Sequence, residues 1–179
     1  NLDQVDIFGD SNPNGAYMAP VLLRQDDPFK NTDVHDIEAF GPVSTIMPYD
    51  TLDDAIQLAK MGKGSLVSSV ATYDDKIARD YVLGAASYHG RILVLNRESA
   101  PESTGHGSPM PLLVHGGPGR AGGGEEMGGV RGVKHYMQRC AVQGSPSTLT
   151  EVTGVYQYGG KYKDSGQHLF RKHFEDIHI

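Results

Sequence analysis

The fold is decided within Val43–Asn96, which reads VSTIMPYDTLDDAIQLAKMGKGSLVSSVATYDDKIARDYVLGAASYHGRILVLN. Its first residues, Val43–Met47, are mostly β-branched and lie just inside two prolines, a pattern typical of a short strand. We expect Thr51 to cap a helix, with Asp54 completing an approximate capping box and Gly62 and Gly64 ending the helix.

The same pattern then repeats along the segment. Ser65–Ala71 is predicted to be a second strand, and Asp74 is expected to cap a second helix that Gly90 ends. Arg91–Asn96 follows with four consecutive apolar residues, as in a strand covered on both faces of a parallel sheet. The apolar positions that recur at helical spacing are Leu52, Ala55, Ile56 and Ala59 in the first helix, and Ile77, Ala78, Tyr81, Val82 and Ala85 in the second.

The order strand, helix, strand, helix, strand predicts an α/β fold built on a parallel βαβαβ sheet. Ahead of it, Val5–Phe8 is predicted to be a short strand. Tyr17–Leu23 contains Pro20, which indicates an edge strand or an extended loop.

Glycine dominates the chain after the sheet segment. Gly105–Gly132 contains eleven glycines and three prolines, so we expect a loop laid over the sheet. A short helix over Gly129–Tyr136, a strand over Met137–Val142 and a helical turn over Pro146–Val152 are predicted next. Residues 153–167 lack a core pattern and are interpreted as a linker between domains.

Composition restricts the class of protein. Hydrophobic residues make up 38% of the chain and charged residues 21%, which is ordinary for a soluble domain. The net charge of −6 argues against a nucleic-acid partner, and the lack of a long apolar run argues against a membrane partner. A single cysteine, Cys140, fits a reducing compartment, so we expect a cytoplasmic protein.

Several motifs are weaker than they first look. Gly117–Gly122 fits the G-x-G-x-x-G pattern, but the dinucleotide fingerprint also needs a strand before it and an amphipathic helix after it. Cys140 lies in a predicted strand, which favours a buried apolar role over a nucleophile. His106 and His115 match no metal-binding spacing, so no metal site is predicted, and their acid–base role stays open.

Glu38–Val43, which reads EAFGPV, combines a carboxylate, an aromatic ring and a Gly-Pro turn. Two carboxylate oxygens can accept hydrogen bonds from a vicinal diol such as that of a ribose. The same residues could equally form an exposed acidic loop, so the residue types alone leave both interpretations open.

With the residues that follow it, this segment resembles the aldehyde dehydrogenase family, whose catalytic domain carries Glu-x-Phe-Gly-Pro-Val ahead of a similar strand and helix order. A narrower set of blocks resembles the bifunctional members that act in aerobic phenylacetate degradation. Those enzymes join an NADP-dependent dehydrogenase to a C-terminal hot-dog hydratase. The blocks are residues 102–109 (ESTGHGSP), 114–126 (VHGGPGRAGGGEE), 133–139 (VKHYMQR) and 168–176 (HLFRKHFED).

The resemblance implies an oxidoreductase that oxidises a CoA-linked semialdehyde to its acid with NADP, NAD being possible. Glu38 would bind the nicotinamide ribose and Phe40 would contact the nicotinamide. Residues 1–152 would be the C-terminal part of the dehydrogenase domain, and residues 168–179 the start of the hydratase. Met137–Val142 would be the strand of a homo-oligomer.

The same resemblance places the cysteine nucleophile and the glutamate base of the family upstream of this chain. No catalytic residue is therefore expected here, and the chain alone should not turn over. The alternative is a structural or oligomerisation piece without catalysis.

Overall fold

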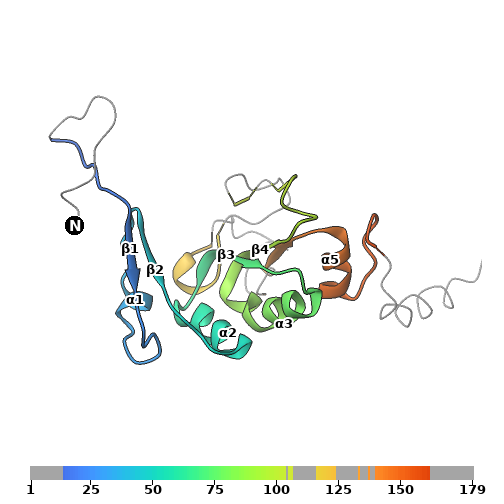
Figure 1. Ribbon diagram of the computed structural model, residues 1–179, viewed down its shortest axis with the longest axis horizontal. Helices are drawn as coiled ribbons and strands as arrows, with labels where there is room; N and C mark the ends of the chain where they lie inside the picture. The colour runs from blue at the N-terminus through green and yellow to red at the C-terminus, as the bar shows by residue number, and fades with distance from the viewer. Residues whose placement is uncertain are drawn as a thin grey trace, which may run out of the picture. The chain divides into compact units, whose positions relative to one another are not determined.

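The computed structural model describes residues 14–103, 105–106, 116–123, 133, 137 and 140–161 (Figure 1). They fall into two compact units, an N-terminal unit within Asn1–Asp50 and a C-terminal unit within Thr51–Ile179. Within the described residues, no helix is both long and apolar enough to cross a membrane.

The N-terminal unit holds a two-stranded parallel sheet and a single turn of helix. Strand β1 covers Val21–Arg24, helix α1 covers Asp33–Asp36, and strand β2 covers Val43–Ile46. Val21 lies opposite Val43 in the register of the two strands. The predicted strand over Val43–Met47 is thus confirmed, one residue shorter than expected.

The strand expected over Tyr17–Leu23 begins later, at Val21. Pro20 has no backbone N–H to donate, whereas the Val21 N–H donates to the Pro42 carbonyl oxygen at 2.8 Å. The proline therefore stands at the point where pairing starts, not inside the strand.

The C-terminal unit is a three-stranded parallel sheet with helices. Its strands are β3 (Ser65–Ala71), β4 (His89–Leu95) and β5 (Ala141–Gln143), in the order β3-β4-β5. Its helices are α2 (Leu52–Met61), α3 (Asp75–Ala85), α5 (Pro146–Thr153) and the 3-10 turns η2 (Ala86–Tyr88) and η3 (Gly119–Ala121).

Local side-chain bonds explain where the two central helices begin. Thr51 Oγ1 accepts from the Asp54 backbone N–H at 3.1 Å, and the Asp54 carboxylate accepts from the Thr51 N–H at 3.0 Å. This is a complete capping box, and Gly62 follows as the C-cap, as predicted. The Asp74 carboxylate likewise accepts from the first free backbone N–H groups of α3, at Lys76 and Ile77.

The α/β class with parallel strands is confirmed, and the strands of the expected βαβαβ unit are divided between two parallel sheets. Strand β2 pairs with β1 in one sheet, whereas β3, β4 and β5 form another. Hydrophobic periodicity identifies a strand without identifying its hydrogen-bonding partner. Only the second half of the expected unit, β3-α3-β4, is a parallel pair joined by a helix.

The core of the C-terminal unit lies between one face of the sheet and its helices. Ile92 and Val94 of β4 are fully buried there against α3, with Ala78, Val82 and Ala85. Helices α3 and α5 contact each other, and α3 lies below β4 in the view of Figure 1. Alternate residues of β4 therefore point to the opposite face of the sheet.

Gly90 was predicted to end the second helix, and this is wrong. Helix α3 ends at Ala85, and Gly90 is the second residue of β4. A Cβ at Gly90 would lie 1.7 Å from the Gly116 carbonyl oxygen, so the backbone of the glycine-rich loop passes directly over it. The expectation of a loop laid over the sheet is confirmed for residues 116–122, which contact the first residues of β3 and β4.

The strand expected over Met137–Val142 begins later, at Ala141. Met137 is exposed in a bend, and Cys140 directly precedes the strand. The predicted turn over Pro146–Val152 is confirmed as α5. The predicted strand over residues 5–8, the helix over residues 129–136 (apart from Val133) and the hydratase start at residues 168–179 lie outside the described residues.

Candidate functional site

The segment Glu38–Val43 links helix α1 to strand β2 and is held at both ends. At its start, buried His35 places its Nε2 2.9 Å from the Pro28 carbonyl oxygen, which anchors α1. At its end, the Val43 N–H donates to the Gly41 carbonyl oxygen at 2.7 Å, forming a tight turn. The segment between these two anchors is therefore held in place, and it carries a few exposed side chains.

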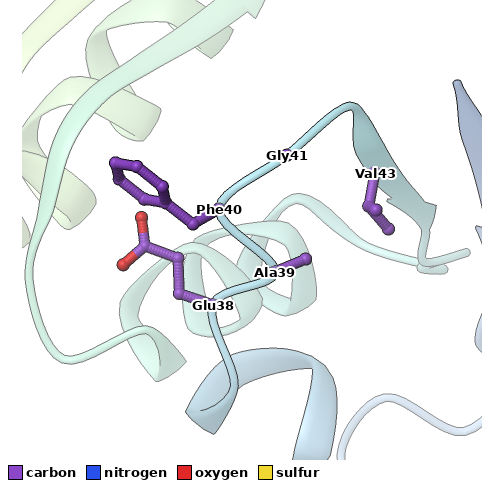
Figure 2. Close-up of a pocket in the computed structure, with 5 residues that line it drawn as sticks. All are labelled: Glu38, Ala39, Phe40, Gly41 and Val43. Atoms are coloured by element: carbon purple, nitrogen blue, oxygen red, sulfur yellow. The ribbon is translucent and has the colours of Figure 1, made fainter. Parts of the chain in front are cut away.

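The side chains of Glu38 and Phe40 extend to the same side of this segment (Figure 2). Ala39 points away from them (Figure 2). The open hollow at this point has a volume of about 440 Å³ and is lined by Glu38, Ala39, Phe40, Gly41 and Val43. The structure therefore brings together the two residues that the resemblance assigns to cofactor binding.

Phe40 combines two unfavourable features. Its φ is +43°, in the left-handed region that a bulky residue rarely adopts, and 93% of the residue is exposed to solvent. Such a conformation costs on the order of 1–3 kcal/mol and is enriched at ligand-binding positions. An exposed aromatic ring held in a strained turn is a surface suited to stacking on a planar ligand.

Glu38 is exposed, and its carboxylate oxygens have no hydrogen-bond partner among the residues that the structure describes. Its acceptor capacity is therefore available for hydroxyl groups of a ligand. No cluster of three or more His, Cys, Asp or Glu side chains suited to a metal ion occurs in the described part of the chain. A carboxylate that can accept hydrogen bonds from two neighbouring hydroxyl groups, Glu38, thus lies beside the exposed ring of Phe40.

The G-x-G-x-x-G segment, Gly117–Gly122, is a closed turn. The Gly117 N–H donates to the Gly122 carbonyl oxygen at 2.9 Å, and the turn contains only the short helix η3. The Arg120 N–H donates to the Lys63 carbonyl oxygen at 3.2 Å. Its position against the start of β3 supports a packing role in place of phosphate binding.

His106, whose role the sequence left open, lies against the sheet. Its Nε2 is 2.8 Å from Ser69 Oγ, and its carbonyl oxygen accepts from Arg91 Nη2 at 2.7 Å. Burial, followed by the positive charge of Arg91, lowers the pKa of His106. His115 lies outside the described residues.

Cys140 packs against the core beside β5 and is partly buried. Burial raises the pKa of its thiol from 9.0 to about 11. Because the thiolate is the reactive form, this thiol is poorly suited to nucleophilic catalysis at neutral pH. The structure thus agrees with the apolar role predicted for Cys140.

This raised pKa predicts slow alkylation of Cys140 by iodoacetamide in the folded protein. At pH 8 the thiolate fraction is on the order of one in a thousand, and the rate should rise about tenfold per pH unit until pH 11. Since the folded thiol holds its proton more tightly than the unfolded one, its contribution to stability falls as pH rises from 9 to 11. Mass spectrometry of alkylated peptides, with urea-unfolded protein as control, measures the rates. Equal rates in folded and unfolded protein at pH 8 would refute the burial.

Sequence reasoning missed one buried network in this unit. Thr148, which is fully buried, donates from Oγ1 to the Asp75 carboxylate at 2.8 Å and accepts from Asn96 Nδ2 at 3.1 Å. Asn96 is 52 positions from Thr148 along the chain, so no local pattern could have revealed the contact.

With this geometry established, the comparison with known proteins identifies the class. Residues 5–142 match the aldehyde dehydrogenase family, and the chain belongs to that family. The match includes the Glu38–Val43 segment and ends within β5.

Two relatives are more specific. The chain is 53% identical over 168 residues to "Protein MaoC" of Klebsiella aerogenes, covering 94% of this chain and 50% of that protein. It is 43% identical over 103 residues to the "3,4-dehydroadipyl-CoA semialdehyde dehydrogenase" of Aromatoleum evansii, covering 58% of this chain and 20% of that protein. The chain thus spans half the length of the first relative and a fifth of the second.

Proposed function

We propose that the protein containing this chain oxidises a CoA-linked semialdehyde to its acid with NADP⁺, NAD⁺ being the alternative coenzyme. The family membership supports an oxidoreductase that acts on aldehydes. The CoA-linked substrate class is supported by the printed name of the relative from Aromatoleum evansii. The ring-opening catabolism of phenylacetate is the pathway that we propose for it, from the sequence blocks 102–109, 114–126 and 133–139.

The observation that carries the proposal is the presentation of Glu38 and Phe40 on one side of a fixed turn. A carboxylate with free acceptor oxygens fits the vicinal hydroxyls of a ribose, and an exposed ring fits a nicotinamide face. In this proposal, Glu38 orients the ribose and Phe40 holds the ring at the mouth of the hollow. The bound nicotinamide would supply the hydride acceptor.

We further propose that this chain provides half of a site and does not turn over alone. Its only cysteine holds a raised thiol pKa of about 11 and lies in the C-terminal unit beside β5, whereas an aldehyde dehydrogenase needs a reactive thiolate. In the whole protein, residues 153–167 would link the dehydrogenase domain to a hydratase that begins near residue 168. We propose a homo-oligomer in the cytoplasm.

The substitution Glu38→Gln in the full-length protein tests the ribose role. The amide keeps the shape of the side chain but replaces one acceptor oxygen by a donor and removes the charge. Loss of charged hydrogen bonds of about 1.5–3 kcal/mol should lower kcat/KM for NADP⁺ about tenfold to a hundredfold, with unchanged thermal stability.

Glu102→Gln is the matched control, since Glu102 is an exposed glutamate of the C-terminal unit, outside the segment under test. Its steady-state kinetics should equal those of the unsubstituted protein. Unchanged coenzyme kinetics in Glu38→Gln, measured by NADPH absorbance over a range of coenzyme concentrations, would refute the ribose role.

A further inference from the structure

The face of the three-stranded sheet opposite α3 carries a buried arginine. Ile92 and Val94 point to the helices, so Arg91 points to the other face, where Val67 and Ala141 flank it in register. Only 3% of Arg91 is exposed. A guanidinium group is rarely buried to this extent unless it is paired.

The partners of Arg91 leave much of its hydrogen-bonding capacity unused. Nη2 donates to the His106 carbonyl oxygen at 2.7 Å, but Nε and Nη1 are buried and have no acceptor among the described residues. His106 Nδ1 is also buried and unpartnered, while Nε2 of the same ring lies 2.8 Å from Ser69 Oγ. Unpaired buried polar groups are uncommon in native proteins, so three in one cluster need an explanation.

The guanidinium group of Arg91 also lacks a counter-charge within the ranges that the structure describes. The ion pairs among the described residues, Arg24–Asp26, Lys30–Asp27 and Lys161–Glu98, do not include Arg91. Burying an isolated charge during folding costs free energy, and a bound anion would offset that cost. Water could satisfy the donors but would leave the charge uncompensated.

We propose that Arg91 binds a small oxyanion, a carboxylate or a phosphate group, through Nε–H and Nη1–H. In the tautomer in which Ser69 Oγ–H donates to Nε2 of His106, the imidazole proton lies on Nδ1 and is a third donor beside Arg91. Guanidinium donors match the geometry of both oxyanions. The burial of Arg91 restricts the ligand to a small anion or to the terminal group of a larger one.

Hydrogen exchange of the full-length protein tests the proposal locally. Exchange of amides in His89–Leu95 is followed by mass spectrometry during titration with sodium acetate or sodium phosphate. Sodium chloride at the same ionic strength is the control. At an anion concentration ten times Kd, exchange through opening of this strand should slow about tenfold. Acetate alone acting identifies a carboxylate site, and phosphate acting identifies a phosphate site.

Two substitutions assign the effect to the guanidinium group. Arg91→Gln should abolish the protection, whereas Arg97→Gln, an exposed arginine just beyond the end of β4, should retain it. Should Arg91→Gln not fold, Arg91→Lys keeps the charge without the planar donor fork and should raise the half-saturating concentration about tenfold.

Three results would overturn the proposal. Equal protection by all three salts would show general screening, and protection that persists in Arg91→Gln would place the anion elsewhere. No protection by either oxyanion would show that the protein's own groups or water satisfy Arg91.

Discussion

Replacing Gly90 by alanine is expected to destabilise the three-stranded sheet by about 3 kcal/mol or more. The added Cβ would lie 1.7 Å from the Gly116 carbonyl oxygen, 2.8 Å from its carbon and 3.0 Å from Gly117 Cα. All three atoms belong to backbone, which cannot rotate away as a flexible side chain can. Strand β4 and the glycine-rich turn would have to separate.

The effect is measured as faster amide exchange in β4 of the full-length protein, converted to a free energy of opening. Gly62→Ala is the matched control because Gly62 has a φ of −67°, and its added Cβ would meet only Ser65 Oγ, at 3.4 Å. Gly62→Ala should change the free energy by less than about 1 kcal/mol. A Gly90→Ala protein as stable as the control would mean that residues 116–117 do not pack on β4.

The features that sequence predicted well are those fixed by neighbours along the chain. The capping box at Thr51, the cap at Asp74 and the glycine end of α2 depend on groups within three or four residues. The alternation between strand and helix is equally local, because each element must turn an apolar side toward the core.

Features fixed by distant contacts could not be predicted in this way. Nothing near Val43 shows that β1 is the partner of β2, and nothing near Gly90 shows that residue 116 passes over it. Gly90 was predicted to end a helix because a glycine that follows a helical pattern is a common helix C-terminus. A glycine needed for close backbone approach looks the same in sequence.

The same distinction between what sequence predicted and what only the structure shows applies to the candidate sites. Family resemblance singled out Glu38 and Phe40, and the structure adds that both side chains extend to one side of a turn in which Phe40 is left-handed. Arg91 drew no attention because an arginine at the start of an apolar strand normally reaches solvent. Its guanidinium group donates to the carbonyl oxygen of His106, fifteen positions away, and no local pattern reveals this contact.

Thr148→Val is expected to destabilise the C-terminal unit by about 3 kcal/mol although valine has nearly the same shape. Thr148 is fully buried, and its hydroxyl joins three elements at one point. It donates to Asp75 at the start of α3 and accepts from Asn96 at the end of β4 and from Ser145 Oγ at 3.1 Å. Valine removes a donor from a buried carboxylate and an acceptor from a half-buried amide.

The loss should extend beyond global stability to the turn that follows β4. Asn96 Oδ1 accepts from the Glu98 and Ser99 N–H groups at 2.9 and 3.0 Å, so a misplaced Asn96 releases both amides. Hydrogen exchange at these two amides should accelerate more than exchange in α2, which Thr148 does not contact through this network. Thr153→Val, an exposed position of the same helix, is the control and should change stability by no more than about 0.5 kcal/mol. If Thr148→Val changed stability no more than this control, the Thr148 hydroxyl would contribute nothing measurable, and packing alone would hold Asn96 against α5.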